Sequence, residues 1–385
     1  MDTITNLETT ASPALLFDAD AINRNLALML KIVGGDPSRL RPHIKTHKCR
    51  EILTLQLALG ITQVKCATIA EAELSAIAGV PDVLISYPLV GPNVDRFFQL
   101  IAAYPATKFS TLVDCERALE AFVRTANAPV SLFIDLDCGM HRTGISPGAD
   151  ALNLVRTLVA NPALHFAGVH AYDGHIHDAP LEARREQFDT AMAILNGFVE
   201  LVEDSVAPVP LVVAGGSPTF ALHAAQAAIS PRPRQCSPGT TVLWDTGYGG
   251  YYDDLTFEPA AFLLTRVVSH PGGDHPGGDH PGGDRPGEGR LCVDLGHKAV
   301  AAENLIGRRV RFPAIPDARF VSQSEEHLVL EGVDPSAWPV GTPLIGIPIH
   351  VCPTVALHQE ARIIRGNSIT SEKWDIAARN RRITI

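Results

Sequence analysis

A lysine surrounded by other basic side chains is the first residue in this sequence with a chemical signature. Lys45 lies in the segment 41–48, which reads RPHIKTHK and supplies an arginine, two histidines and a second lysine around it. Nearby positive charges disfavour the ammonium form, so they lower the pKa of an amine and make it nucleophilic near neutral pH. The pattern indicates a lysine that forms a Schiff base with a carbonyl compound. The simpler alternative is a solvated basic loop.

Two further segments carry side chains that could bind a ring-shaped ligand. Arg142 lies in the segment 138–144 (CGMHRTG), and Tyr172 lies in the segment 170–175 (HAYDGH). An arginine and a tyrosine could hydrogen-bond a phenolate-like oxygen on a bound ring. Alternatively, Arg142 merely pairs with Asp135 or Asp137.

Two glycine-rich turns are candidates for a phosphate site. They contain Gly215-Gly216-Ser217 and Gly239-Thr240. Backbone N–H groups in late loops of an α/β barrel commonly bind phosphate, although each turn alone could be an ordinary chain reversal.

A fourth candidate site is the segment 348–354, which reads PIHVCPT. On a predicted strand, His350 and Cys352 are two residues apart and point to the same face. An imidazole nitrogen and a thiolate sulfur supply half of a Zn²⁺ site. The alternative is that both side chains are packing residues of a half-buried strand.

These residues must be positioned by the elements around them, and short apolar runs alternate with helix-length segments along the first part of the chain. We expect eight strands near residues 40–42, 63–67, 83–87, 109–113, 130–136, 166–171, 211–214 and 241–244. The alternation predicts an α/β protein with a TIM-like (β/α)8 barrel over residues 21–248. Strand-like runs with little helical periodicity then predict a mostly antiparallel β domain over residues 249–385, with residues 1–20.

Composition limits the functional class. The 385 residues include 46% hydrophobic and 19% charged residues, and the formal net charge of -10 disfavours partners such as nucleic acid or an anionic membrane. Seven scattered Cys, no signal peptide and no apolar stretch of membrane-spanning length predict a cytoplasmic protein. The HPGGD repeat over residues 270–287 predicts a flexible surface loop whose histidines are too poorly preorganised for a specific metal site.

Taken together, the motifs resemble those of the D-threonine aldolase and D-serine dehydratase family, the metal-dependent branch of fold-type III pyridoxal 5′-phosphate (PLP) enzymes, which is related to alanine racemase. The resemblance spans nearly the whole chain and rests on residues 12–16, 41–48, 68–72, 141–144, 294–299, 324–327 and 350–354. It implies that Lys45 forms a Schiff base with PLP and that Arg142 and Tyr172 contact the cofactor near its ring oxygen. It also implies that the two turns, at 215–217 and 239–240, hold the phosphate. A divalent metal, Zn²⁺ or Mn²⁺, would be bound by His350 and Cys352.

The resemblance implies a lyase that acts on small β-hydroxy-D-amino acids, and two outcomes stay open. If His175 or His177 takes the β-hydroxyl proton, the Cα–Cβ bond breaks and gives glycine and an aldehyde. If Lys45 takes the Cα proton and the metal assists loss of hydroxide, the products are a keto acid and ammonia. Cys352 resembles the dehydratases, whereas Tyr172 with Gly174 resembles the aldolases, and we favour the aldolase.

Two other functions remain as alternatives. A non-catalytic PLP-binding protein on the same barrel would lack a β domain, and a racemase would need no metal. By resemblance alone we expect a homodimer.

Overall fold

The structure is a computed structural model that describes residues 4–126, 129–249, 252–271 and 289–385, and its chain divides into two units. The barrel unit comprises the described residues within 26–241, 252–256 and 377–385, and the β unit comprises those within 4–25, 242–249 and 257–376. Most of the HPGGD repeat lies outside the described residues. No helix in the described part of the chain is long and apolar enough to cross a membrane.

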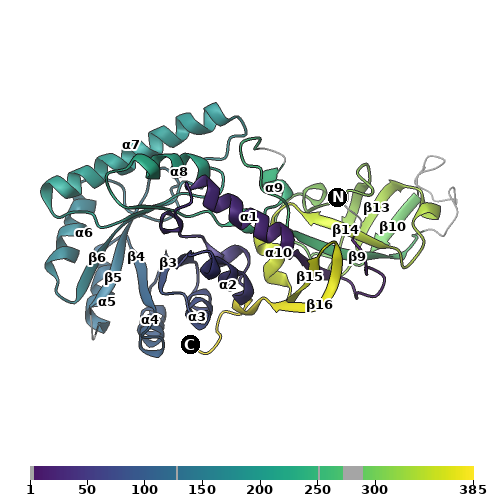
Figure 1. Cartoon of the computed structure of the whole chain (residues 1–385), viewed down its shortest axis with the longest axis horizontal. Helices are drawn as coiled ribbons and strands as arrows, with labels where there is room; N and C mark the ends of the chain where they lie inside the picture. The colour runs from purple at the N-terminus through teal and green to yellow at the C-terminus, as the bar shows by residue number, and fades with distance from the viewer. Residues whose placement is uncertain (1–3, 127–128, 250–251, 272–288) are drawn as a thin grey trace. The chain divides into compact units, whose positions relative to one another are not determined.

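The barrel unit is built on a seven-stranded parallel sheet in which neighbours in sequence are neighbours in space. Its strands are β2 (Gln63–Cys66), β3 (Asp82–Pro88), β4 (Lys108–Val113), β5 (Val130–Leu136), β6 (Leu164–Ala171), β7 (Val212–Ala214) and β8 (Arg234–Cys236). The helices are α2 (Arg50–Ala58), α3 (Ile69–Ile77), α4 (Pro92–Ala103), α5 (Glu116–Thr125), α6 (Ala149–Ala160), α7 (Leu181–Ser205) and α8 (Phe220–Ile229). Helix α1 (Ala19–Ile32) begins in the β unit and ends in the barrel unit. Figure 1 shows α4 to α7 on the outside of this sheet.

An irregular segment closes the sheet between β8 and β2. Leu40 forms an isolated parallel bridge with Cys236, and His43 forms another with Lys65. Arg41 N–H donates to the Cys236 carbonyl (2.8 Å) and Lys65 N–H donates to the Pro42 carbonyl (2.9 Å). Because proline has no N–H to donate, these residues complete the barrel without forming a regular strand.

The predicted fold class is confirmed, but two of the eight predicted strands are wrong. Residues 40–42 form only the isolated bridges, and the run at 241–244 falls in a 3₁₀ helix, Thr240–Val242, and the loop after it. The last strand is instead β8, whose three residues include the polar pair Arg234 and Gln235. Such a short, polar strand gives no apolar run, and hydrophobic periodicity therefore misses it.

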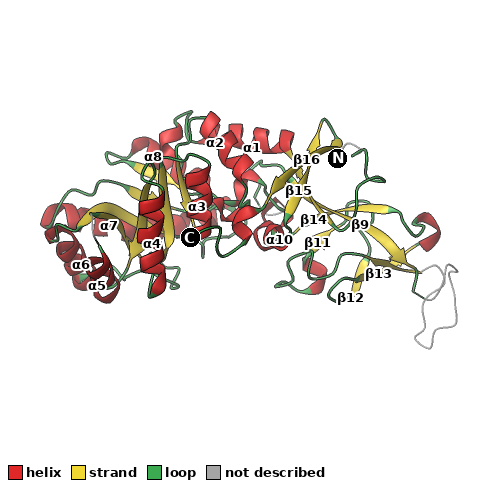
Figure 2. Ribbon diagram, turned by 90° about the horizontal axis from the view of Figure 1, so that it is seen from below, coloured by secondary structure: helices red, strands yellow, loops and turns green. Residues whose placement is uncertain are grey.

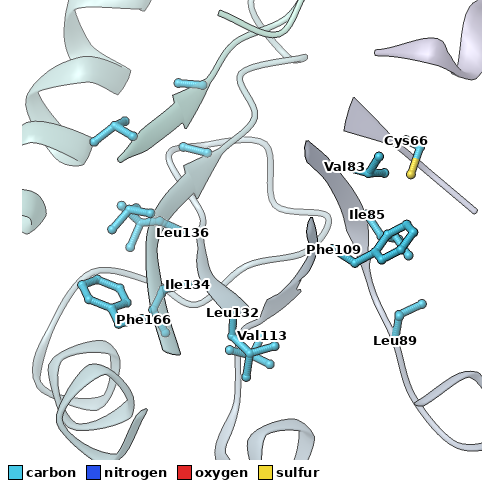
Figure 3. Packing of buried hydrophobic residues seen from close by; sticks show 14 of the residues in the cluster. Cys66, Val83, Ile85, Leu89, Phe109, Val113, Leu132, Ile134, Leu136 and Phe166 are labelled. Atoms are coloured by element: carbon cyan, nitrogen blue, oxygen red, sulfur yellow. The ribbon is translucent and has the colours of Figure 1, made fainter. Parts of the chain in front are cut away.

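Side chains of the parallel strands alternate between two packed layers. Figure 3 shows the layer between the sheet and its helices, which includes Val83, Ile85, Phe109 and Ile134. The opposite parity faces the barrel interior, where a smaller apolar cluster is formed by Leu84, Leu112, Phe133, Ala167 and Val213. A residue that is paired with this second set in the sheet therefore points into the barrel.

The β unit contains a nine-stranded sheet, and Figure 2 shows its strands connected mostly by loops. The strands are β1 (Ala14–Asp18), β9 (Ala261–Ser269), β10 (Gly289–Val293), β11 (Val310–Arg311), β12 (Arg319–Gln323), β13 (Leu328–Val333), β14 (Pro343–Pro348), β15 (Glu360–Arg365) and β16 (Ser368–Asp375). All pairs are antiparallel except β1 with β15. The mostly antiparallel second domain is thus confirmed.

The predicted strand through His350 and Cys352 is wrong. Strand β14 ends at Pro348, and His350 is the N-cap of the short helix α10 (Val351–Leu357). Pro353 lies in the first turn of this helix, where the N–H that proline lacks has no helical partner in any case. The two side chains therefore do not share a strand face, and their positions are set by the start of helix α10.

Candidate active site

The predicted site residues of the barrel unit follow the carboxyl ends of its strands. Lys45 lies in a 3₁₀ turn, Ile44–Thr46, directly after the segment that closes the barrel, and its side chain is half-buried. Arg142 follows β5, and Tyr172 follows β6. Because all seven strands are parallel, these loops emerge at one end of the barrel.

Tyr172 brings three cationic side chains together. Its ring centroid lies 5.8 Å from the Lys45 Nζ, 5.7 Å from the Lys65 Nζ and 4.9 Å from the Arg142 Cζ. These are cation–π distances, so the ring stabilises positive charge. The structure therefore groups Lys45, Arg142 and Tyr172, and it adds Lys65 to them.

The alternative pairing of Arg142 with Asp135 or Asp137 is not present. Asp137 accepts hydrogen bonds from two backbone N–H groups and lies 2.8 Å from the His141 ring. Asp135 lies 2.7 Å from His170 Nδ1 and accepts a second hydrogen bond, from Thr143. Both carboxylates are thus engaged elsewhere, and the Arg142 guanidinium lies over Tyr172.

The basic residues that precede and follow Lys45 in the sequence are mostly neutralised. Arg41 is buried and forms a 2.7 Å ion pair with Asp82, and Lys48 forms an ion pair with the buried Glu71. The nearby amine is instead Lys65, from the adjacent strand β2, at 5.7 Å from the same ring. Lys65 is not among the residues predicted from the sequence, although a lysine between the apolar residues of a strand was a usable signal.

The two glycine-rich turns lie next to each other. The Ser217 hydroxyl oxygen accepts hydrogen bonds from the backbone N–H groups of Gly239 (3.2 Å) and Thr240 (3.0 Å). Gly215 has a φ of +95°, and a Cβ there would lie 2.3 Å from the ring of His223. The Ser217 hydroxyl thus lies beside two N–H groups of the second turn, and the first turn has a backbone conformation that favours glycine. A phosphate cradle needs donors that are grouped in this way.

Two buried polar atoms beside this cradle, Asp173 Oδ1 and Ser237 Oγ, have no hydrogen-bond partner among the described residues. The other oxygen of Asp173 lies 2.8 Å from His223 Nε2, and a Cβ on Gly216 would lie 3.7 Å from Asp173 Oδ1. Orphaned polar groups in a buried site are expected where a polar ligand completes the hydrogen bonding. Together with the amines, the aromatic ring and the cradle, they fit PLP.

The two candidate histidines of the β6–α7 loop have different surroundings. A Cβ on Gly139 would lie 2.9 Å from His175 Nε2, so this ring packs against the loop that carries Arg142. His175 Nδ1 is buried and has no hydrogen-bond partner in the part of the chain that the structure describes. His177 is exposed, and its Nδ1 lies 2.7 Å from the His175 carbonyl oxygen.

A buried arginine holds the end of this loop. Arg184 is fully buried, donates to the carbonyls of Asp178 (2.9 Å) and Ala179 (3.1 Å), and pairs with Asp254. Its guanidinium lies 4.5 Å from the ring centroid of Tyr252. The sequence analysis missed this contact, because the partners are about 70 residues apart in sequence.

The predicted metal pair lies in the β unit, where His350 contacts Cys352 and Glu303. The hydrogen bond with Cys352 raises the pKa of His350 to about 9, with a further contribution from Glu303, whose Oε1 lies 2.6 Å from His350 Nδ1. Burial raises the pKa of the neighbouring Asp245 to about 6. A carboxylate on Nδ1 leaves Nε2 available to a metal, an arrangement typical of metal-binding histidines.

The donor set is incomplete as a metal centre. In the described residues, no group of three or more His, Cys, Asp or Glu side chains is arranged to hold a metal ion. His350 and Cys352 therefore fit half of a tetrahedral site, with the remaining positions left to water or substrate.

Comparisons with known proteins agree with this arrangement. Residues 17–233 match the alanine racemase N-terminal domain, and residues 260–364 match the putative serine dehydratase domain. A D-threonine aldolase from Arthrobacter sp is 30% identical over 380 residues, 96% of this chain and 92% of that protein. A D-threo-3-hydroxyaspartate dehydratase from Delftia sp. is 27% identical over 92% of this chain and 93% of its own length. The crystal structure of D-threonine aldolase from Filomicrobium marinum superposes with a TM-score of 0.82, at 28% identity over 97% of both chains.

Proposed function

The chain belongs to the D-threonine aldolase and D-serine dehydratase family of fold-type III PLP-dependent lyases, and we propose that it cleaves β-hydroxy-D-amino acids to glycine and an aldehyde. The observation that carries this proposal is the grouping of Lys45 and Arg142 around Tyr172, at the barrel end that also carries the two converging turns. An amine, a guanidinium and a phosphate cradle in one site match the aldehyde, ring oxygen and phosphate of PLP.

The barrel residues divide the binding of PLP among them. Lys45 would bind the aldehyde carbon, Arg142 and Tyr172 would contact the ring oxygen, and the turns at 215–217 and 239–240 would hold the phosphate. When bound, PLP withdraws electrons from the bond that breaks at the substrate Cα. The chain itself orients the substrate and moves its protons.

His175 is the better supported base for the β-hydroxyl proton. Its half-buried ring lies against the Arg142 loop with Nδ1 unpartnered, whereas His177 is exposed and would exchange protons with solvent. An imidazole is a common general base in enzymes. We expect His175→Gln to lower the rate of cleavage about 100-fold or more and His177→Gln to have a smaller effect.

We further propose that His350 and Cys352 bind a divalent metal, Zn²⁺ or Mn²⁺. Support comes from their mutual contact and from Glu303, which orients the imidazole. A metal there would act as a Lewis acid toward a hydroxyl oxygen of the substrate. Loss of turnover in His350→Ala with the PLP absorbance band retained would separate the lyase from a protein that only binds PLP.

The second candidate function is a D-serine dehydratase that releases a keto acid and ammonia. The thiol of Cys352 favours this function, since the motif with cysteine resembles that of the dehydratases. The similarity of the chain to a hydroxyaspartate dehydratase also favours it. One incubation distinguishes the two. The protein is given D-threonine or D-serine, with and without EDTA, and acetaldehyde, pyruvate and ammonia are measured. Pyruvate from D-serine without acetaldehyde from D-threonine would refute the aldolase.

A homodimer and a cytoplasmic location are proposals from the family resemblance. Light scattering of the purified protein tests the first, and fractionation of cells tests the second.

A further inference from the structure

Strand β2 places a lysine inside the barrel where an apolar residue is expected. Val64 and Cys66 pack in the layer that faces the helices, so Lys65 has the opposite parity. It pairs in the sheet with Leu84, a member of the interior cluster, and it is 2% exposed. Its amine therefore lies inside the barrel, below the loops that carry the candidate site.

The Lys65 amine is held by a chain of three side chains. Its Nζ lies 3.3 Å from His170 Nε2, and His170 Nδ1 lies 2.7 Å from Asp135 Oδ1. A carboxylate accepts only from a protonated ring nitrogen, so Nδ1 carries the proton and Nε2 accepts from Lys65. Burial and the charge of Lys65 lower the pKa of His170, which keeps the imidazole neutral in this arrangement.

The Lys65 amine also lies beside the residues of the candidate site. The amine lies 5.7 Å from the centroid of Tyr172, the ring that Lys45 and Arg142 also contact. Burial first, and the charge of Lys45 second, lower the pKa of Lys65 to about 7. The charges of Asp135 and Asp173 act in the opposite direction, and that of Arg142 acts in the same direction.

The stability of the folded barrel does not explain why a lysine occupies position 65. Among the described residues its amine contacts an imidazole and an aromatic ring, and no ion pair with a carboxylate is formed. Burying an amine without such a pair destabilises the folded state, and Leu or Met would fill the same space without this penalty. A buried titratable group whose pKa is shifted and that lies beside a site is a candidate for proton transfer.

We propose that Lys65 is a further acid–base residue of this lyase, which exchanges a proton with the substrate Cα and is held for that role by His170. This inference rests on the proposed function. Lys45 is the residue proposed to bind the cofactor, so the second amine beside Tyr172 is the group that stays available for proton transfer throughout turnover.

With Lys65 in this role, every proton that moves during the cleavage has a donor and an acceptor. When the Cα–Cβ bond breaks, its electron pair stays on Cα, and the O–H pair of the hydroxyl forms the aldehyde C=O bond. The hydroxyl proton passes to His175, and Lys65 in its ammonium form gives one proton to Cα. Water then returns the proton from His175 to Lys65, so the products are glycine and an aldehyde, with the enzyme unchanged.

The first test is hydrogen exchange at the Cα of glycine in the holoenzyme. The enzyme is incubated with glycine in D₂O, and loss of the α-proton signal is followed by NMR. We expect Lys65→Met and Lys65→Gln to retain the PLP absorbance band and to slow the exchange 100-fold or more. The matched control is Lys108→Met, at the exposed start of β4, which should exchange as the wild type does. Exchange within about threefold of wild type in both Lys65 variants would overturn the inference.

The second test needs neither cofactor nor activity. In cofactor-free protein labelled with ¹³C-lysine, the Cε signal that disappears in Lys65→Met should titrate near pH 7, whereas an ordinary lysine titrates near 10.5. A midpoint near 10.5 for that signal overturns the inference. A different result would refute the proposed function, and this inference together with it. That result is a wild-type holoenzyme that neither exchanges the α-proton of glycine nor releases an aldehyde from D-threonine.

Discussion

Replacing Lys65 by Met should stabilise the cofactor-free protein, and the gain should depend on pH. The folded pKa of about 7 lies below the ordinary 10.5, so between these values the unfolded chain binds more protons than the folded one. Stability therefore rises with pH through this window, and below about pH 7 the full penalty is present. A displacement of this size corresponds to about 5 kcal/mol.

The methionine variant removes the charge and keeps the volume. At pH 6 we expect the barrel unit to be about 3 to 5 kcal/mol more stable in Lys65→Met than in the wild type, an increase in Tm of roughly 10 °C. By pH 10 most of the difference should have gone, because the wild-type amine is then neutral in the folded state. Differential scanning calorimetry of both proteins from pH 6 to 10 measures this directly.

The exposed control, Lys108→Met, should shift Tm by less than about 1 °C at every pH, because its charge is solvated in both states. The reasoning is refuted if Lys65→Met lowers Tm at pH 6, or if its effect is the same at pH 6 and pH 10. Either result would mean that the Lys65 ammonium is well accommodated in the barrel.

Three other perturbations test separate parts of the site. Ser217→Ala removes the acceptor for two backbone N–H groups and should weaken PLP binding about tenfold in a titration of the cofactor-free protein; unchanged affinity would argue against the cradle. Asp254→Ala leaves the fully buried Arg184 charge without its carboxylate, so we expect a loss of about 3 kcal/mol in stability and faster amide exchange in residues 175–180 by mass spectrometry, and unchanged exchange there would contradict the holding role. Glu303→Gln weakens the contact that orients His350 and should lower metal affinity 10- to 100-fold by isothermal titration calorimetry, unlike a mutation of a carboxylate that plays no part in metal binding.

Hydrophobic patterning was sufficient for most of the barrel and insufficient where the chain departs from regular strand geometry. The apolar runs at 130–136 and 166–171 lie in β5 and β6, because buried parallel strands are apolar on both faces. Strand β8 has only three residues, two of them polar, and its place is fixed by pairing with β7. Such a strand is determined by its neighbours in space and leaves no periodicity to read.

The motif at His350 shows a second limit. The spacing of the two donors places them together on a strand but on roughly opposite sides of a helix. Pro348 and Pro353 were visible in the sequence, yet proline is compatible both with the end of a strand and with the first turn of a helix. The contact between His350 and Cys352 therefore occurs at the start of α10, where His350 is the N-cap, and it does not result from a shared strand face.

The charges around Lys45 show why proximity in sequence was a poor guide to proximity in space. Arg41 lies before the 3₁₀ turn Ile44–Thr46 that carries Lys45, and Lys48 lies after it, with a φ of 52°. Arg41 is paired with Asp82 and Lys48 with Glu71, and neither needs a ligand to balance its charge. The amine that lies beside the same aromatic ring comes from β2, and its orientation depends on strand parity, which a shift of one residue would reverse. The electrostatic environment of this site is therefore set by the closure of the barrel, and the RPHIKTHK motif contributes mainly the lysine itself.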